Sequence, residues 1–439
     1  MEVFFIRALQ LIMALSLLVL IHEFGHFIFA RIFKVRVEKF YLFFDWGFSL
    51  FKWKPKNSET EYGVGWIPLG GYCKISGMID ESMDTEQMKQ PIQPWEFRSK
   101  PAWQRLLIMI GGVMFNFILA MFIYAMIMFT WGESYTDIRK ATYGMEFNEN
   151  AKSLGFVDGD IILKVDEQDV DRYSVDLLRA IADGKEVTVS RAGEEVVIEI
   201  PEDFGLLDMG KESPFMQFRL PAVIDSILPA SAAQVAGLQK GDSIMSISGE
   251  AITSWNKLMV TMQKMQEKGC NTIEITAMRD SIVTFTANVD STYKLGITPC
   301  SPDYPVTRIK YNFIEAFPAG ISYGWNVLKG YVSDFKYLFS KEGAQSVGMF
   351  GTIGSLFPAM WNWHQFWLMT AMLSLILAVM NILPIPALDG GHVVFLLIEV
   401  ITGRKPSDKV LEYAQMVGML ILLALFILAT YNDAMRFIF

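Results

Sequence analysis

Four stretches of this chain are long and apolar enough to cross the hydrocarbon core of a bilayer, which takes about 20 consecutive helical residues. They lie at residues 4–32, 106–131, 366–388 and 413–431. Asn381 and two prolines interrupt the end of the third stretch, a break that is tolerated where the backbone lines a cavity or packs against neighbouring helices. This pattern predicts a polytopic α-helical membrane protein with four transmembrane helices.

The composition indicates that water-exposed domains accompany these helices, because 52% of the residues are hydrophobic and 19% are charged. The formal net charge of −9 argues against a nucleic-acid partner, which favours a basic surface. The three cysteines form no CxxC pair, so a cysteine-rich metal site is not expected. Cys270 and Cys300 could pair if their segment lies outside the cytoplasm, and the sequence leaves their redox state open.

The distribution of Lys and Arg predicts the orientation in the membrane. Basic residues concentrate in the loop 31–105 and in the short loop that carries Arg404, Lys405 and Lys409. With four spans, both loops lie on one side, and the positive-inside rule makes that side cytoplasmic. Both termini and the middle segment, about 132–365, are then expected outside the cytoplasm.

The first apolar stretch contains the run His22-Glu23-Phe24-Gly25-His26. Residues four apart lie on one helix face, about 6 Å apart along the axis, a spacing that suits two ligands of one zinc ion. The intervening Glu23 is placed to act as general base on a metal-bound water. The alternative is a chance pattern in a packed helix, but ionisable groups at membrane depth are costly and are usually functional.

A third ligand has to come from elsewhere, because catalytic zinc sites commonly use three protein ligands and one water. The first and third spans run in the same direction, so Asp389, at the cytoplasmic end of the third, is expected at the depth of His22 and His26. Two prolines before it can turn the carboxylate inward. His392 is the rival ligand, and a helix-end cap is the other interpretation of Asp389.

The middle segment contains an internal duplication. The pattern Gly-x-x-x-Gly-Asp, followed by an apolar strand-like run, occurs at 155–160 and again at 237–242. A helical stretch and two further β-type runs follow each copy. The repeat predicts two copies of one small α/β unit, at 132–210 and 215–300.

Two other segments have distinct patterns. Residues 33–78 alternate strand-like runs with turn residues, which predicts a β-hairpin or small β layer close to the membrane. Segment 313–345 is amphipathic and rich in aromatic residues. It either lies on the outer membrane surface or packs as a connecting helix against the preceding soluble domain.

The predicted division of the chain has nine parts. These are span one with the HExxH run (1–33), a cytoplasmic β-loop (34–105), span two (106–131), the two α/β units (132–210 and 215–300), an amphipathic connector (301–364), span three with the third metal ligand (365–391), a cytoplasmic loop (392–412) and span four (413–432).

These motifs together resemble a known family. HEFGH in the first span, with Asn381-x-x-Pro-x-Pro-x-Leu-Asp389-Gly-Gly in a late span, is similar to the site-2 protease family of intramembrane zinc metalloproteases. Two PDZ-like units between spans two and three resemble its bacterial, sigma-E-regulating branch, and the likeness covers essentially the whole chain. The resemblance implies one catalytic Zn²⁺ held by His22, His26 and Asp389, Glu23 as general base, and a place in the bacterial inner membrane.

The resemblance also implies residues that bind substrate: Asn381, Gly70, Gly71, Tyr72 and Asn116. Asn116 ends the match to a second-span glycine–asparagine motif, from which the chain departs at Val113, where the family often has proline. Residues 70–72 resemble a membrane-facing β-loop whose edge strand holds extended substrate. This fits a physical need, because a helical segment has to unwind before cleavage and a strand edge can pair with it.

The function that these features favour is cleavage of transmembrane segments of single-pass membrane proteins inside the lipid bilayer. By resemblance, substrates include an anti-sigma factor or remnant signal peptides, and the PDZ-like units filter substrates by size or bind peptide C-termini. The alternative is a membrane-anchored PDZ scaffold with a non-catalytic zinc site, whose function would survive Glu23→Gln. A metal transporter would distribute ionisable residues along several spans, whereas here they cluster at one depth.

Overall fold

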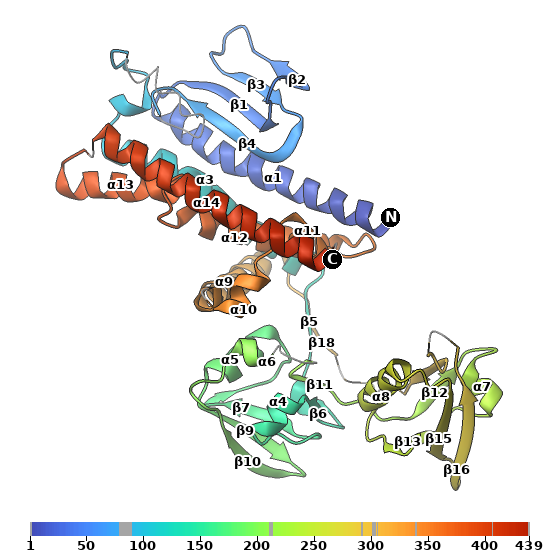
Figure 1. Ribbon diagram of the computed structural model, residues 1–439. Helices are drawn as coiled ribbons and strands as arrows, with labels where there is room; N and C mark the ends of the chain where they lie inside the picture. Colours follow the sequence, from blue (N-terminus) through green and yellow to red (C-terminus); the bar gives the residue numbers. More distant parts are fainter. Residues whose placement is uncertain are drawn as a thin grey trace. The chain divides into compact units, whose positions relative to one another are not determined.

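The computed structural model of the protein describes residues 2–78, 90–209, 214–290, 293–300, 304, 306–338, 340–405 and 407–437. The chain forms two compact units: Met1–Glu133 with Lys310–Phe439, and Ser134–Ile309. We call them the helical unit and the modular unit and describe each by itself (Figure 1). The predicted boundary between the two α/β units, near residue 210, and the start of the predicted connector at 301 lie outside the described residues.

Four helices of the helical unit are long and apolar enough to cross a membrane, which confirms the number of predicted spans. They are α1 (Glu2–Ile32), α3 (Ala102–Thr130), α12 (Trp363–Ile382) and α14 (Asp408–Phe437). The central one is α3, which packs against α1 and α12 and also against two further helices, α13 (Asp389–Thr402) and α9 (Phe313–Leu338). The elements that carry the predicted metal ligands therefore share one neighbour.

Glycines bring α1 and α3 into backbone contact. A Cβ built on Gly25 would overlap the carbonyl group of Gly111, and one built on Gly111 would lie 2.6 Å from the carbonyl oxygen of Gly25. Small residues at such crossings let membrane helices approach closely, so that dispersion between backbones contributes to their association. The HExxH face of α1 is thereby held directly against α3.

The third span ends earlier than predicted. Helix α12 stops at Ile382 and does not run to residue 388, because Pro384 and Pro386 lack the N–H that a continuing helix requires. The chain turns through 383–388 and starts a new helix, α13, at Asp389. Asp389 is thus the first residue of a separate helix, and residues 392–402 of the segment 392–412, predicted as loop, are helical.

The predicted β layer is a four-stranded sheet in the segment after α1. Its strands are β1 (Val37–Phe44), β2 (Phe51–Trp53), β3 (Glu61–Val64) and β4 (Ile67–Ile75). The strand order is β2-β3-β1-β4, with β1 parallel to β3 and antiparallel to β4, so β4 is an edge strand. Both β4 and β1 pack on α1 (Figure 1).

Helix α9, in the segment predicted as an amphipathic connector, packs against α3, a contact that neither sequence-based alternative included. Gly320 faces the backbone of Ala125, and a Cβ on Gly324 would lie 2.8 Å from Sδ of Met121. Two short helices follow, α10 (Lys341–Ser346) and α11 (Phe350–Ser355). From Lys310 on, the predicted connector is therefore part of the helical unit.

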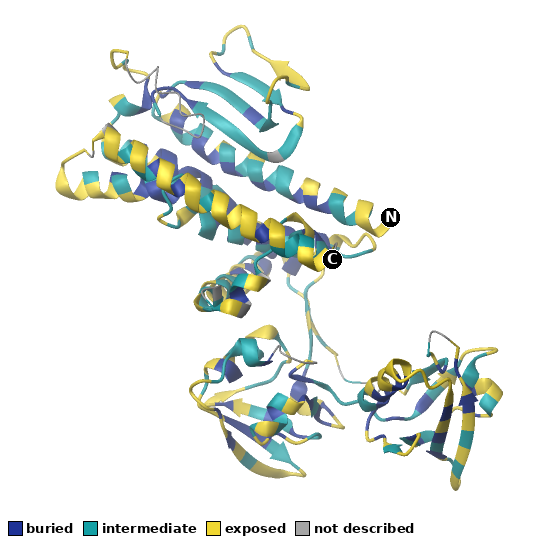
Figure 2. Cartoon of the chain, viewed as in Figure 1, coloured by how far each residue is buried: buried dark blue, intermediate teal, exposed yellow. Residues whose placement is uncertain are grey.

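Helix α14 is attached mainly near its C-terminal end. The Asp433 carboxylate accepts hydrogen bonds from the backbone N–H groups of Met349 (3.1 Å), Gly351 (2.8 Å) and Thr352 (3.3 Å), which caps α11. Elsewhere most α14 side chains are exposed (Figure 2), as expected for a helix that faces lipid. Gly418 is a second contact, because a Cβ there would overlap the carbonyl oxygen of Pro386.

The modular unit contains two modules of the same topology. The first has the sheet order β10-β9-β7-β8 and the second β16-β15-β13-β14, and each adds a separate strand pair, β6–β11 and β12–β17. The strands of the first module are β6 (Met145–Phe147), β7 (Ile161–Val165), β8 (Gln168–Asp169), β9 (Glu186–Arg191), β10 (Glu194–Glu199) and β11 (Met216–Phe218). Those of the second are β12 (Ile224–Ile227), β13 (Ser243–Ile247), β14 (Glu250–Ala251), β15 (Thr272–Met278), β16 (Ile282–Asn288) and β17 (Ile297–Pro299).

Helices complete both modules in equivalent places. They are α4 (Glu149–Ser153), α5 (Val175–Asp183) and α6 (Leu206–Met209) in the first and α7 (Ala232–Ala236) and α8 (Trp255–Glu267) in the second. Each module has its own hydrophobic core. One further strand pair, β5 (Glu133–Thr136) with β18 (Val306–Ile309), joins the chain segments that enter and leave the modules. Cys270 and Cys300 are unpaired and exposed.

The Gly-Asp pattern of the repeat has the same structural role in both modules. Asp160 accepts from Arg191 at 2.9 and 2.7 Å, and the same guanidinium donates to the carbonyl oxygen of Gly155 at 2.8 Å. Asp242 and Arg279 repeat this arrangement at 2.7 and 2.8 Å. Both aspartates are almost fully buried, so each fastens a glycine turn to a strand through an ion pair.

Candidate metal centre

The three predicted ligands converge on one point in the helical unit. Nε2 of His22 lies 3.1 Å from Oδ2 of Asp389, Nε2 of His26 lies 3.2 Å from the same oxygen, and the two nitrogens are 3.3 Å apart. Both imidazoles are buried. Within the described residues this is the single group of three or more His, Cys, Asp or Glu side chains with ligand-like spacing.

With both histidines neutral, this cluster presents a set of lone pairs that suits a cation. Nδ1 of His26 lies 2.9 Å from the carbonyl oxygen of Ile108, which only accepts, so Nδ1 carries the proton and donates. The Nε2 atom of a neutral His26 then has a lone pair, and it faces a carboxylate oxygen and another imidazole nitrogen. Three lone-pair atoms this close repel one another unless a cation lies between them. Two imidazoles and one carboxylate are a donor set that suits zinc.

Helix α3 contacts both histidines without contributing a ligand. Besides the Ile108 carbonyl, it brings the buried Asn116 amide within 3.2 Å of Nδ1 of His22. It also leaves room for the rings at Gly112, where a Cβ would lie 2.7 Å from Cε1 of His22 and closer still to Nε2 of His26. Sequence analysis named Asn116 as substrate-binding, and the structure puts its amide against a predicted metal ligand.

Glu23 lies beside this cluster on the same α1 turn. Its carboxylate accepts a hydrogen bond from the backbone N–H of Cys73, on the edge strand β4, and it interacts electrostatically with His22, His26 and Asp389. Glu23 is held next to the cluster but is not one of its three ligand residues. Its carboxylate is therefore placed to exchange protons with a water molecule bound at the cluster.

Of the other polar residues in and after the third-span motif, one lies close to the cluster and one is not part of it. The half-buried Asn381 approaches the cluster, with its amide nitrogen 3.5 Å from Nε2 of His22. His392, the rival third ligand, lies one turn into α13 and is not a member of the ligand group. Asp389 is therefore the third residue that the geometry brings to the histidines.

The glycines of the β-loop bring β4 against α1. A Cβ on Gly71 would lie 2.8 Å from Cγ1 of Val19, one helical turn before His22. Tyr72 points to the other face of the sheet, where its ring stacks on Tyr41 with centroids 5.3 Å apart and its hydroxyl donates to Asp45 at 2.9 Å. Burial and the Asp45 carboxylate raise the pKa of Tyr72, so its phenol stays neutral. Of residues 70–72, Gly71 is the one that contacts α1, and Tyr72 contributes no side chain to that face.

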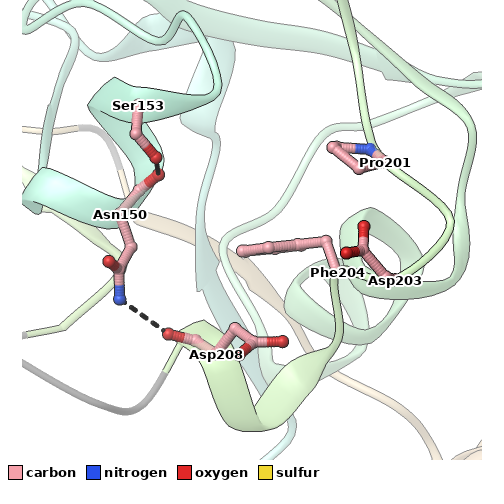
Figure 3. A pocket seen from close by; sticks show the side chains of 6 residues that line it. All are labelled: Asn150, Ser153, Pro201, Asp203, Phe204 and Asp208. Atoms are coloured by element: carbon pink, nitrogen blue, oxygen red, sulfur yellow. Dashed lines mark hydrogen bonds between the residues drawn. The ribbon is translucent and has the colours of Figure 1, made fainter.

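A hollow of about 250 Å³ lies in the first module (Figure 3). It is lined by Asn150, Ser153, Pro201, Asp203, Phe204 and Asp208. The Asn150 amide bridges its wall by donating to the carbonyl oxygen of Asp208 at 2.9 Å. This lining has two carboxylates and no basic side chain among the described residues, so the hollow does not suit the carboxylate of a peptide C-terminus.

Two kinds of contact could not be read from the sequence. The Ile108 carbonyl is a backbone atom, and no side-chain pattern marks it. The arginines that pair with the repeated aspartates come 31 and 37 residues after them, a spacing that differs between the copies and so hides the correspondence. The two repeats share one sequence signal for this contact. Arg191 is the last residue of β9, and Arg279 directly follows β15, the equivalent strand.

Comparisons with known proteins identify the family of this chain. A family model described as peptidase family M50 matches residues 10–425. The chain is 28% identical to Protease RseP of Yersinia pestis and to Regulator of sigma-E protease RseP of Escherichia coli (strain K12), with 97% of both chains covered each time. A putative zinc metalloprotease of Vibrio cholerae is similar to the same extent. Because the family model spans nearly the whole chain, the protein belongs to peptidase family M50.

Proposed function

We propose that the protein is an intramembrane zinc endopeptidase that cleaves transmembrane segments of single-pass membrane proteins. The observation that carries this proposal is the convergence of His22, His26 and Asp389 beside Glu23, within a bundle of helices long enough to cross a membrane. Membership of a peptidase family supports hydrolysis, and the name of the Vibrio cholerae relative supports zinc as the metal.

The chain's own residues divide the work of hydrolysis. When bound, zinc supplies a Lewis acid and makes a water molecule more acidic. Glu23 takes the proton of the attacking water and returns it to the leaving amine. The hydrogen bond from Cys73 orients the Glu23 carboxylate.

Two contacts from α3 orient the histidine ligands, as outer partners commonly do at metal sites. The Ile108 carbonyl fixes the tautomer of His26. Turning the Asn116 amide by 180° exchanges its oxygen and nitrogen, so that Oδ1 accepts from Nδ1–H of His22. This turn also gives a role to Oδ1, which has no hydrogen-bond partner among the described residues. We therefore assign Asn116 to ligand orientation and not to substrate binding.

The substrate is proposed to bind as an added strand on β4. A transmembrane helix has its scissile carbonyls hydrogen-bonded internally, so it has to unwind, and an edge strand offers replacement partners. The position of β4 at the edge of its sheet and the contact of Gly71 with α1 near His22 support this proposal, in which Gly70 and Gly71 add no side chain beside the substrate strand. Asn381, close to the cluster, would donate to a substrate carbonyl.

The sidedness follows from the distribution of basic residues. We propose that the β-loop and metal site lie toward the cytoplasm of the bacterial inner membrane, and that the two modules lie outside it as PDZ-like domains. There they would exclude bulky substrates or bind peptide C-termini. The names of the relatives support substrates of the kind cut in sigma-E regulation, such as an anti-sigma factor.

The proposal is tested with wild type, Glu23→Gln and, as a control, Glu2→Gln near the exposed start of the same helix. Each variant is purified in detergent, its zinc content is measured, and cleavage of a model transmembrane substrate is followed. We expect Glu23→Gln to keep zinc but lose cleavage by at least about a thousandfold, since the general base is removed, while Glu2→Gln cleaves normally. Cleavage retained by Glu23→Gln would rule out the mechanism, and zinc without cleavage in the wild type would favour a scaffold.

A further inference from the structure

Asp389 is the first residue of α13 and is not part of a membrane-spanning helix. The third span ends at Ile382, and the proline-containing turn 383–388 separates it from α13, whose first residue is Asp389. The place of this carboxylate relative to His22 and His26 therefore depends on how α13 is fixed to the rest of the unit.

Two kinds of contact fix α13 to α3. Val393 and Leu396 pack into the same hydrophobic cluster as Ile108 and Met109. Farther along α13, the carboxylate of Glu399 accepts a hydrogen bond from Nη2 of Arg105, and both side chains are largely shielded from solvent, at 16% and 9% exposed. This pair joins residues that are 294 positions apart in the chain.

The Arg105 guanidinium is held independently of Glu399. Its Nε donates to the carbonyl oxygen of Lys100 at 2.9 Å, and its carbon lies 6.0 Å from the centroid of the Phe97 ring. A cation fixed in this way presents its remaining N–H groups in one direction, which favours one position of the partner carboxylate. The pair is thus a directional contact, which adds an orientation to the non-directional apolar packing of α13.

The same part of α3 also orients a histidine. Ile108, whose carbonyl binds Nδ1 of His26, lies one helical turn after Arg105. Glu399 lies ten residues after Asp389, about 15 Å along α13. Successive turns of α3 therefore hold the α1 ligand and the helix that carries the third ligand, so a shift of α13 against α3 is a shift of Asp389 against His26.

We propose that Arg105 and Glu399 are positioning residues that set Asp389 in register with the two histidines. This inference rests on the zinc site proposed above. Partners outside the ligand set commonly change metal affinity by about 10- to 100-fold when they are mutated. Arg105→Gln and Glu399→Gln are each expected to weaken zinc binding within that range.

The experiment measures zinc dissociation constants by chelator competition on the full chain in detergent. The variants are Arg105→Gln, Glu399→Gln and the charge-swapped double variant Arg105→Glu with Glu399→Arg. The controls are Arg404→Gln and Glu412→Gln, which remove the same charges from exposed positions on the segments after α13. We expect the single variants to lose affinity, the controls to match wild type, and the swap to recover most of the loss.

Two further readouts separate positioning from general stability. The visible spectrum of the Co²⁺-substituted protein reports ligand geometry, and it is expected to change in the single variants. At saturating zinc, kcat is expected to fall while KM stays close to the wild-type value, because the substrate strand contacts β4 and not α13. If a single variant does not fold, Glu399→Asp, which shortens the side chain by one methylene, is expected to give a smaller loss of affinity.

Wild-type zinc affinity and an unchanged cobalt spectrum in all folded variants would overturn the inference. So would a charge-swapped protein that folds but binds zinc no better than the single variants. A wild type that binds no zinc would instead contradict the proposed function, and a wild type that binds zinc without cleaving substrate would contradict only the peptidase mechanism. The two failures are therefore distinguishable.

Discussion

Gly112 lies against both predicted histidine ligands, whose rings fill the space that a side chain at this position would need. A single methyl group there would overlap Nε2 of His26 and lie 2.7 Å from Cε1 of His22. Neither ring is free to retreat, because His26 is tied to Ile108 and His22 to Asn116. The absence of a side chain at this position is therefore as important to the cluster as the ligands are.

We predict that Gly112→Ala lowers zinc affinity by at least tenfold, because the rings have to move away from Asp389 to make room. The overpacked helix crossing should also destabilise the protein by about 1–3 kcal/mol. Zinc titration and thermal unfolding in detergent measure the two effects. Ile118→Ala, at an exposed position of the same helix, should leave both unchanged. Normal zinc affinity in Gly112→Ala would contradict the close contact.

A second residue-scale prediction concerns Asp242 in the second module. Burial acts to raise its pKa, but the hydrogen bonds from Arg279 and from the backbone N–H of Gln239 outweigh this and lower it. A carboxylate with a lowered pKa in the folded state stabilises the fold at pH values above its unfolded pKa, about 3.9. That contribution is lost as the pH falls through the folded value.

Asp242→Asn should therefore destabilise the second module by about 2 kcal/mol at pH 7, the magnitude expected for hydrogen bonds to a buried charge. The difference from wild type should begin to shrink below about pH 4, where Asp242 of the unfolded chain becomes protonated, and should vanish as the pH falls through the lowered pKa of the folded state. Pulse proteolysis of the full chain at several pH values measures this. Asp225→Asn, which breaks an exposed pair with Lys240, serves as the control and should change stability by less than about 0.5 kcal/mol. A difference that is independent of pH would contradict the assignment.

At the scale of elements, features that depend on a local sequence pattern were predicted correctly. Contacts between segments far apart in the chain were not predicted. The HExxH spacing and the four apolar runs are local, so the ligand pair on α1 and the number of spans followed from them. The end of the third span did not follow, because an apolar run through residue 388 hides the break that Pro384 and Pro386 impose. The attachment of α9 to α3 likewise depends on two glycines meeting a helix about 200 residues earlier in the chain.

The attachment of α14 gives a prediction at this scale. Oδ2 of Asp433 accepts from three backbone N–H groups at the start of α11 and Oδ1 accepts from the Thr352 hydroxyl, and an amide cannot replace both oxygens as acceptors. In Asp433→Asn, the amide protons of Met349, Gly351 and Thr352 should exchange at least about tenfold faster, equivalent to 1.4 kcal/mol. Hydrogen exchange with mass spectrometry measures this. Tyr431→Phe, at an exposed neighbouring position, should exchange like wild type, and equal exchange in Asp433→Asn would show that the cap contributes nothing.

At the scale of the whole molecule, the main feature is that the metal centre lies entirely in one of the two units. Every predicted metal ligand, and each side chain or carbonyl that contacts one, belongs to the helical unit. The two modules have their own cores and their own buried ion pairs. Their duplication was predictable from the repeated Gly-Asp pattern, whereas their strand pairing required the structure.

We predict that replacing residues 138–304 with a short flexible linker leaves zinc affinity within about twofold of wild type, because no contact of the metal centre is removed. Strands β5 and β18 are kept so that their pairing still closes the segment. If the modules exclude bulky substrates, the shortened protein should also cleave a model substrate with a large extramembrane domain that the full chain leaves uncut. Loss of zinc binding in the shortened protein would mean that the modules support the centre.

The backbone contact between Gly25 and Gly111 has a consequence for membranes of different thickness. Since the backbones of α1 and α3 touch directly at this crossing, the two helices have to tilt together, and the cluster moves with them as one body. Helix α14, held chiefly near one end by Asp433, is the span with most freedom to change its angle. Hydrophobic mismatch in a thinner or thicker bilayer should accordingly be absorbed by α14, leaving the distances among His22, His26 and Asp389 unaltered.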